Sequence, residues 1–235
     1  MKRIGMLCLL LCLLAVSGCA NETLVPDAAQ TEIVLATPKA ERRYPSGDLA
    51  PLEIERGNLE IANGVILYPK VVSGGYADAI NAAVCQCARD NAEGLAAQVF
   101  TEYRIEYNDK GLLSLMLFIR EAQTDTLLFC MPLNFDTASG LVCDLAYFFD
   151  PNDEGWRDEL ARMVEAEAKN SDAMLLHDVA PMEDDRPFYI SDQGLVIQYR
   201  LYEISTYSAG WPEFTIPIAS VREYLAPNSP LTRLG

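Results

Sequence analysis

One cysteine near the start of the chain, Cys19, stands where a covalent modification is expected. It follows two small residues that end an apolar run from Ile4 to Val16, and two basic residues precede that run. A basic start, a short apolar core and small residues before a cut are the features of a secretory signal. The run is too short to cross a bilayer as a stable helix, which takes about 20 apolar residues. The chain is therefore expected to be exported.

The segment Val16–Cys19 resembles the cleavage motif of bacterial lipoproteins, in which the signal is cut before the cysteine and the thiol is diacylated. The resemblance implies that residues 1–18 are a signal peptide and that Cys19 is the lipidated first residue of the mature chain. Each buried lipid methylene contributes about 0.8 kcal/mol, so acylation at Cys19 anchors a protein firmly to the membrane. The expected location is extracytoplasmic, on the bacterial cell membrane. The alternative is an ordinary secretory signal cut near Ala15 or Ala20.

The charge of the chain limits its partners. The formal net charge is −16, and removal of residues 1–18 takes away two basic residues and no acid, which leaves −18. A chain this acidic does not bind nucleic acid or an anionic lipid surface through its net field. It attracts cationic partners, although an acidic surface is also a common means of keeping an exported protein soluble.

The remaining cysteines and the single histidine do not suggest a metal site. Cys85 and Cys87 are two residues apart on an expected helix, so they point to different sides and cannot pair there. We interpret these two, with Cys130 and Cys143, as small apolar residues that are mostly buried. No spacing suits zinc, and His177 is the only histidine. We expect no metal and no cofactor.

Carboxylates are plentiful, but none is marked as catalytic by its surroundings. The segment Asp150–Gly155 resembles a calcium loop at first sight. Its fifth position is Glu154 and its twelfth is Ala161, where a bidentate glutamate is required, so we interpret it as a helix start. No nucleophile elbow, phosphate-binding loop or dinucleotide-binding motif is present. We therefore predict no catalytic residue.

Residues 19–51 are expected to form a tether between the lipid and the folded region. Residues 20–51 contain four prolines and no sustained hydrophobic periodicity. A flexible stretch of this length spans about 30 Å on average, which lets the folded region stand clear of the membrane. Ile33–Leu35 could add a short edge strand, so the tether need not be without structure.

The first half of the folded region predicts a hairpin, a helix and a meander. Asn63-Gly64 between short apolar runs is a strong signal for a tight β-hairpin. Residues 76–97 predict a helix whose buried stripe includes Cys87. Strands are expected at 98–107, 112–120 and 126–135, the last with apolar residues on both faces, as in a strand covered on both sides. A turn at Asp136–Gly140 would then set Leu133 opposite Cys143.

The second half predicts a further helix and two closing strands. Asn152 or Asp153 can cap a helix with an apolar stripe at Trp156, Leu160, Met163, Val164 and Ala168. One closing strand is expected to carry Leu195, Ile197, Tyr199 and Leu201 on one face, and the next is expected to carry Phe214, Ile216 and Ile218. A short helix is expected to follow at 219–225. Pro217 indicates an edge or a strand end. Runs of strands with helices between them indicate an α+β fold rather than βαβ units. We expect an antiparallel sheet of meander and hairpins with a few packed helices, either as one unit or as two lobes that meet near residue 140.

The C-terminal third resembles a known domain. Phe188–Val196 and Tyr202–Pro217 are similar to the signature of the RsiV-like domain, DUF3298, and Asn134–Asp136 matches it further upstream. Tyr68–Lys70 followed by a helix is similar to the PdaC-type (DUF4163-like) module that often accompanies it. The resemblance implies a PdaC-type module at 52–140 and an RsiV-like module at 141–235.

The resemblance narrows the expected function to a free-standing lipoprotein. An anti-sigma factor needs a cytoplasmic segment before a spanning helix, and a polysaccharide deacetylase needs metal ligands that one histidine cannot supply. The first expectation is therefore non-catalytic binding of a cell-surface ligand, either a basic lysozyme-like (muramidase-like) protein or cell-wall glycan (peptidoglycan). The alternative is a glycan-acting cell-wall hydrolase with an unrecognised carboxylate site. Relatives often have a glycine-rich loop with a histidine where this chain has Arg120–Thr126, so the role of that loop is in doubt here.

The predicted binding residues lie in the loop that enters the last strand: Tyr202, Tyr207, Gly210, Trp211 and Phe214. Aromatic residues of this kind are favoured at recognition surfaces. A glycine and a proline near Trp211 would hold the loop stiff. The alternative, which the residue types favour, is that these rings close one end of the core and hydrogen-bond the loop.

Overall fold

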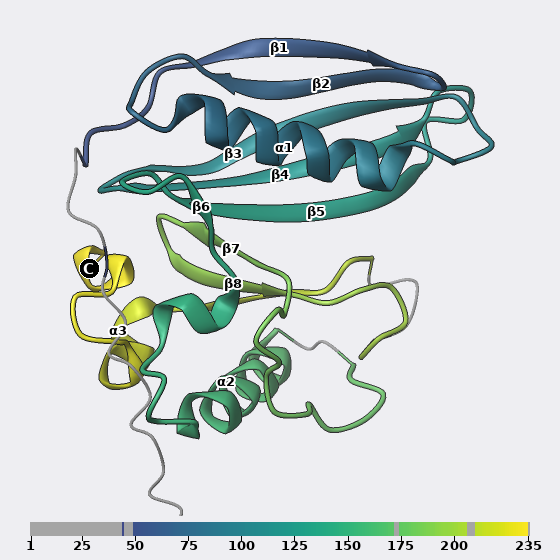
Figure 1. The fold of residues 1–235 in the computed structure, drawn as a ribbon. Helices are drawn as coiled ribbons and strands as arrows, with labels where there is room; N and C mark the ends of the chain where they lie inside the picture. The colour runs from purple at the N-terminus through teal and green to yellow at the C-terminus, as the bar shows by residue number, and fades with distance from the viewer. Residues whose placement is uncertain (1–43, 45–48, 172–173, 206–209, 235) are drawn as a thin grey trace, which may run out of the picture. The chain divides into compact units, whose positions relative to one another are not determined.

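The protein is described by a computed structural model that places residues 44, 49–171, 174–205 and 210–234 (Figure 1). The described residues all belong to one compact unit. Its strands build a six-stranded sheet and a separate three-stranded antiparallel sheet, with helices packed beside them. The predicted α+β class is confirmed. Cys19, the signal and most of the tether lie outside the described residues.

The six-stranded sheet has its strands in chain order, and one helix covers one of its faces (Figure 1). The elements of this layer are β1 Ile54–Ile61, β2 Gly64–Val71, α1 Ala77–Ala92, β3 Val99–Asp109, β4 Leu112–Glu121, β5 Leu127–Asp136 and β6 Leu141–Val142. The second layer contains η1 Leu145–Phe148, α2 Gly155–Asn170, β7 Phe188–Ser191, β8 Gly194–Gln198, β9 Glu213–Ile216, α3 Ile218–Val221, η3 Arg222–Tyr224 and η4 Pro230–Arg233. Within the described residues, no helix has the length and apolar character needed to cross a bilayer.

The predicted hairpin forms between β1 and β2, but its turn lies one residue earlier than the Asn-Gly signal suggests. Ile61 pairs with Gly64, so Ala62 and Asn63 form the loop. The Asn63 amide donates hydrogen bonds to the carbonyls of Ala92 and Leu95 at 2.9 and 3.1 Å, where α1 ends. This asparagine is therefore used to satisfy helix carbonyls that have no partner within the helix.

One pair of strands in the six-stranded sheet is parallel, which the sequence did not lead us to expect. β2 and β3 pair in parallel at Gly64 with Val99 and at Val65 with Phe100, and α1 lies between them in the chain. The expectation of wholly antiparallel pairing without a βαβ unit is wrong here. The reason is that α1 packs back along the sheet, so the chain returns to the end at which β2 began.

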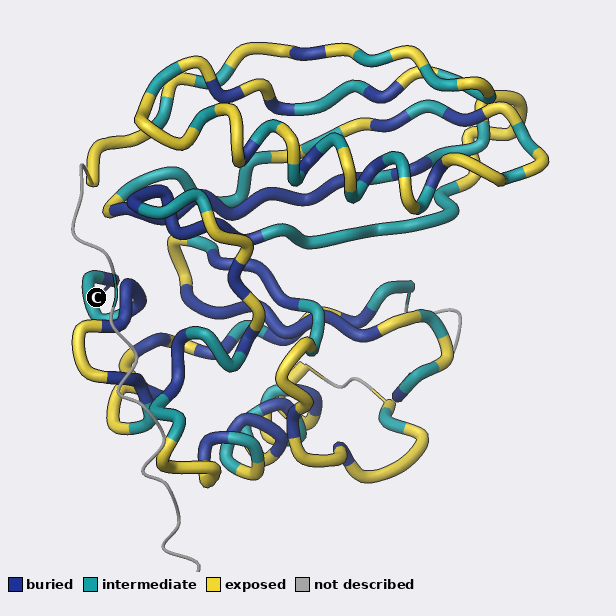
Figure 2. Tube along the Cα trace, in the orientation of Figure 1, coloured by how far each residue is buried: buried dark blue, intermediate teal, exposed yellow. Residues whose placement is uncertain are grey.

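The buried stripe of α1 differs from the predicted one. Its buried residues are Ile80, Val84, Ala88 and Ala92, and these face β2, β4 and β5 (Figure 2). Cys87 lies beside this stripe and is half-buried. The helix ends at Ala92 rather than near residue 97.

The strand buried on both faces is β4, not the strand at 126–135. Leu113, Leu115 and Leu117 of β4 face the helix, whereas Met116 contacts the second sheet. β4 is central, with β3 and β5 as neighbours, and both of its faces are covered. β5 lies closer to the edge, and most of its residues are half-buried.

The register of the β5–β6 hairpin also differs from the prediction by one residue. Asp136 pairs with Leu141, and the Cys143 N–H donates to the Asn134 carbonyl at 2.8 Å. Asn134, not Leu133, therefore lies opposite Cys143, because the turn between Asp136 and Leu141 holds one residue more than expected. The cysteines of the described residues are all free, and Cys143 is buried.

The second layer packs β7, β8 and β9 against α2 around a large apolar core. Trp156, Leu160, Val164 and Ala168 of α2 are buried there as predicted, whereas Met163 is half-buried. β7 is a strand that the periodicity did not reveal. Leu195, Ile197 and Tyr199 join the core; Leu201 lies in a turn after β8. Pro217 follows the end of β9, as expected.

Two buried polar residues join the two sheets. The Ser114 hydroxyl on β4 donates to Asn134 Oδ1 at 2.7 Å, and Asn134 Nδ2 donates to the Phe188 carbonyl at 2.8 Å. The Ile190 N–H in turn donates to Ser114 Oγ at 2.9 Å. Both side chains are almost fully buried. This network fixes β7 against β4 and β5.

The end of the predicted tether lies on the folded unit. The Tyr44 hydroxyl donates to the Tyr147 carbonyl at 2.6 Å, and the two rings meet edge to face. The Gly111 N–H donates to the Leu49 carbonyl at 3.2 Å. The 140/141 boundary between modules stays a prediction, although β6, at 141–142, pairs with β5 of the first sheet.

Candidate binding cleft

The structure separates the five predicted binding residues into different environments. Tyr202 is 65% exposed, and Phe214 is 3% exposed and belongs to the core. Trp211 is half-buried, and Gly210 has a positive φ of 72° with open space around it. Tyr207 lies outside the described residues. Of the described four, Trp211 is the one that lines a large cleft.

That cleft, which we call the β5 cleft, has a volume of about 620 Å³. Its lining comes from one strand and from the loops of the second layer: Asn91, Leu128, Phe129, Cys130, Met131, Pro132, Asp185, Pro187, Gln198, Tyr199, Arg200, Leu201 and Trp211. Most of these side chains are apolar or aromatic, with a few polar groups among them. Such a lining is typical of ligand sites, where apolar surface gives affinity and polar groups give orientation.

The wall opposite β5 is held by Arg186, a half-buried arginine. The Arg186 guanidinium is paired with Glu203 and lies over the Tyr199 ring, 4.6 Å from its centroid. Phe214 meets the Tyr199 ring edge to face, with centroids 6.0 Å apart. Burial raises the pKa of Tyr199 to about 12, so its hydroxyl stays protonated at physiological pH. Phe214 thus supports this wall from behind.

Two residues that line the β5 cleft, Gln198 and Cys130, belong to a polar cluster with Tyr189 and Glu213, which do not line it. Gln198 Nε2 donates to the Cys130 sulfur at 3.3 Å and to Glu213 at 3.1 Å. The Tyr189 hydroxyl donates to the same carboxylate at 2.9 Å. Burial raises the pKa of Cys130 to about 11, so the thiol is protonated and a poor nucleophile. Glu213 is engaged by two donors, which suits a structural carboxylate.

Carboxylates in the β5 cleft do not form a pair. Asp185 is the one carboxylate residue among its described lining residues. Glycoside hydrolysis normally uses two carboxyl groups about 5–10 Å apart across the scissile bond. The lining of this cleft therefore suits binding better than hydrolysis.

A smaller hollow of about 290 Å³ beside α2 does bring two carboxylates together, with His177. Glu165 accepts the Val179 N–H at 3.0 Å, and Asp178 follows the histidine in the chain. Both ring nitrogens of His177 lie near backbone carbonyls, of Asp178 at 3.0 Å and of Glu203 at 2.9 Å. These hydrogen bonds raise the pKa of His177. Glu165 and His177 hold the backbone here, which leaves them poorly placed for catalysis.

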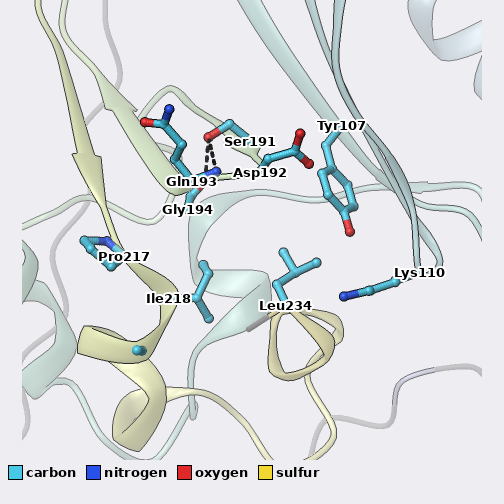
Figure 3. Close-up of a pocket in the computed structure, with 10 residues that line it drawn as sticks. Tyr107, Lys110, Ser191, Asp192, Gln193, Gly194, Pro217, Ile218 and Leu234 are labelled. Carbon is cyan, nitrogen blue, oxygen red and sulfur yellow. Dashed lines mark hydrogen bonds between the residues drawn. The ribbon is translucent and has the colours of Figure 1, made fainter.

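A third cavity, of about 300 Å³, lies where β7 turns into β8 (Figure 3). The Lys110 amine and the Tyr107 ring stand at one side, and Ile218 and Leu234 form an apolar floor. The Lys110 amine donates to the Arg233 carbonyl at 3.0 Å. Its charge is thus used to fix the C-terminal turn.

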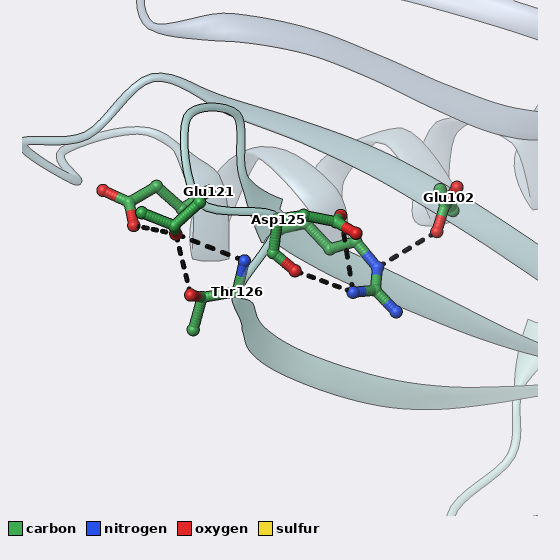
Figure 4. Close-up of polar contacts among 6 residues, drawn as sticks. Glu102, Glu121, Asp125 and Thr126 are labelled. Carbon is green, nitrogen blue, oxygen red and sulfur yellow. Dashed lines mark hydrogen bonds and ion pairs between the residues drawn. The ribbon is translucent and has the colours of Figure 1, made fainter.

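The loop that departs from the family pattern forms a closed hairpin (Figure 4). Arg120 is paired with Glu102 at 3.1 Å and with Asp125 at 3.5 Å, and the Glu121 N–H donates to the Thr126 carbonyl at 2.9 Å. Asp125 adopts a positive φ of 57° at the turn. These contacts tie the loop to its own strands, and it does not line the β5 cleft.

Sequence reasoning missed most of the cleft, because its β5 wall carries no signature. Leu128 to Pro132 have the pattern of an ordinary core strand. One signal could have indicated otherwise: a proline within a strand favours an edge position, and Pro132 lies in the middle of β5. Arg200 and Leu201 come together with β5 only through the packing of the two sheets.

Comparison with known proteins supports the C-terminal resemblance. Residues 148–219 match the model of DUF3298, described as a protein of unknown function. A crystal structure of a DUF3298 family member from Bacteroides fragilis is similar over 80% of this chain and 99% of that one, with a TM-score of 0.51 and 16% identity. A DUF3298 family protein from Pseudomonas aeruginosa gives 76% and 96%, a TM-score of 0.52 and 13% identity. At these identities the likeness concerns the fold alone. The comparison with curated proteins gave no match.

Proposed function

We propose that this protein, whose residues 148–219 form a DUF3298 domain, is a lipid-anchored lipoprotein that binds a cell-surface ligand in the β5 cleft without catalysing a reaction. The observation that carries the proposal is the cleft itself, with apolar walls, Trp211 and one carboxylate residue among its described lining. The PdaC-type assignment of residues 52–140 remains part of the proposal.

The anchor is Cys19, on the outer side of the bacterial cell membrane. The support is the order of a basic start, an apolar run, two small residues and the cysteine. Replacing the cysteine, Cys19→Ser, should move the protein from the membrane fraction to the soluble fraction. Continued fractionation with membranes would contradict the lipid anchor.

The ligand classes are a basic lysozyme-like protein and cell-wall glycan. The net charge of −18 after removal of the signal favours a basic partner, and salt should weaken the attraction. The half-buried Trp211 ring beside Gln198 and Asp185 suits either class, because it gives an apolar face with polar groups around it.

The test is the affinity of the full chain for a basic lysozyme and for purified peptidoglycan, at low and moderate salt. Trp211→Ala should weaken binding by about thirtyfold, the effect of losing an interface residue worth about 2 kcal/mol. Tyr76→Ala is the matched control, because Tyr76 is a 46%-exposed aromatic residue that does not line the cleft. Tyr207→Ala tests the remaining predicted residue. Unchanged affinity of Trp211→Ala for both ligands would refute the cleft as the site.

The hydrolase alternative is tested in the same preparation. If the protein is a cell-wall hydrolase, it should release soluble reducing sugars from peptidoglycan. The pair beside α2 is then the first to examine, with Glu165→Gln and Asp178→Asn measured separately.

A further inference from the structure

One long edge of the six-stranded sheet is open inside the β5 cleft. β5 pairs with β4 along most of its length, from Leu127 to Asp136. On its other side, β6 pairs with Phe135 and Asp136 alone, and the chain then turns away (Figure 1). Among the described residues, no strand covers the rest of that edge.

The register shows which backbone groups face the open side. The Asn134 carbonyl accepts the Cys143 N–H, so the backbone groups of Asn134 point away from β4. Because N–H and C=O groups alternate in direction along a regular strand, those of Cys130 and Pro132 point the same way, whereas a bulge at Leu128 interrupts the alternation. Within the described part of the chain, no hydrogen bond satisfies these outward groups.

The position of Pro132 agrees with this direction. Proline has no N–H to give, and it is found in sheets where its missing donor faces away from a partner strand. Pro132 pairs with Met116 of β4 without losing a ladder hydrogen bond, because its own nitrogen faces the open edge. The edge therefore offers the N–H and C=O groups of Cys130 and the C=O group of Pro132.

These groups lie within the β5 cleft. The cleft is lined by every residue from Leu128 to Pro132, and its other walls include Asn91, Trp211 and Leu201. Five residues of strand extend about 16 Å. The cleft is thus a groove along an unpaired strand edge, with apolar side chains on either side of it.

We propose that this edge is the binding element for an extended polypeptide segment of a basic partner, which adds to β5 as an antiparallel strand in line with β6. The inference rests on the proposed function and narrows its ligand to protein. A row of N–H and C=O groups at strand spacing is complementary to another polypeptide backbone, a pattern that glycan does not offer. Alternate side chains of the segment contact the Trp211 wall, and the net charge of −18 selects a basic partner.

The test uses the full chain and a pool of random heptapeptides displayed on phage, followed by synthetic heptapeptides made from the enriched set. Cys130→Pro removes an outward N–H while the ladder to β4 stays intact, and Cys130→Ala is the matched control, which loses the same thiol but keeps the N–H. Cys130→Pro should weaken peptide binding by about 2- to 12-fold, the effect of one backbone hydrogen bond, and Cys130→Ala by less. Thermal unfolding of both variants checks that they fold.

A second measurement does not depend on a protein variant. Synthetic peptides with N-methyl groups on alternate backbone nitrogens should lose affinity when the methylated nitrogens are those that face β5, and keep it when the other set is methylated. Equal affinities of the two peptides would overturn the inference, as would the absence of any enriched peptide.

Amide hydrogen exchange in the ligand-free chain tests whether another segment already pairs with the open edge of β5. The N–H group of Cys130 should exchange fast, and peptide binding should slow it. Slow exchange without peptide would mean that the edge is already covered, and it would overturn the inference. Sedimentation then separates the two occupants: a dimer indicates a second copy of the chain, and a monomer indicates the segment at residues 33–35. Lysozyme or peptidoglycan binding that is weakened by Trp211→Ala but not by Cys130→Pro would leave the proposed function standing and refute strand addition.

Discussion

The buried link between the two sheets gives the sharpest test of the structure. Asn134→Leu keeps the branched shape of the side chain but replaces its amide with two methyl groups. The Phe188 carbonyl then loses its donor, and the Ser114 hydroxyl loses its acceptor, in a site where Asn134 is 2% exposed. A buried polar group left without a partner costs about 1–3 kcal/mol. We expect a loss of about 3 kcal/mol, because Ser114 still accepts from Ile190.

The assay is equilibrium unfolding in urea together with the thermal midpoint. For a chain of this size, about 3 kcal/mol lowers Tm by about 6–12 °C. Asn58→Leu is the matched control, since Asn58 is exposed on β1 and surface changes usually stay within about 0.5 kcal/mol. Because Ser114 and Asn134 share one hydrogen bond, the double variant Ser114→Ala/Asn134→Leu should lose about 1 kcal/mol less than the two single losses together. Strict additivity, or Asn134→Leu no worse than the control, would refute this account of how the sheets are joined.

Three further outcomes follow from single sites. Tyr147→Phe should cost about 1.5–3 kcal/mol in urea unfolding, because the hydroxyl donates at 2.8 Å to a buried carboxylate; a loss below about 0.5 kcal/mol would contradict this. Gly64→Ala should cost about 1–3 kcal/mol, since a Cβ there would lie 1.8 Å from the Val99 carbonyl oxygen, whereas Gly75→Ala, with open space, should be near neutral. The two ring nitrogens of His177 face the backbone carbonyls of Asp178 and Glu203, which favour the charged imidazolium and raise the pKa of His177. The contribution of His177 to stability is therefore present below its ordinary pKa of about 6.5 and is lost as the pH rises through the raised value. A proton NMR titration that gave an ordinary or lowered pKa for His177 would refute the arrangement.

Local signals in the sequence predicted much of the secondary structure. The turn residues located the β1–β2 and β3–β4 hairpins, and apolar periodicity located α1 and α2. The hairpin errors are one-residue shifts, as in the β5–β6 register, where only the observed pairing of Asp136 with Leu141 reveals the longer turn, whereas α1 ends about five residues before its predicted end. The strand β7 was missed because its residues from Phe188 to Ser191 are too few to show a period. The parallel pair of β2 and β3 could not be predicted, because it depends on which way α1 packs on the sheet.

The predicted binding residues also show which features the sequence indicated and which depended on the fold. Aromatic composition pointed to Trp211, which lines the cleft, and equally to Phe214, which is part of the core, and it could not separate the two. Exposure depends on what packs against a side chain, and in this loop the neighbours come from β8 and from Arg186. The other wall of the cleft is β5, about 70 residues earlier in the chain, so no local pattern could have joined the two.

The sequence by itself determined the α+β class, the acidic charge, the resemblance to DUF3298 and the expected export and lipidation at Cys19. Each of these depends on composition or on residues adjacent in the chain, where propensity and periodicity act directly. Tertiary structure alone decided that β4 is the doubly buried strand, that Ser114 and Asn134 join the sheets, and that β5 keeps an open edge inside a cleft. These features depend on strand order and on contacts between residues far apart in sequence, because burial and hydrogen-bond satisfaction are set by the neighbours that folding brings together.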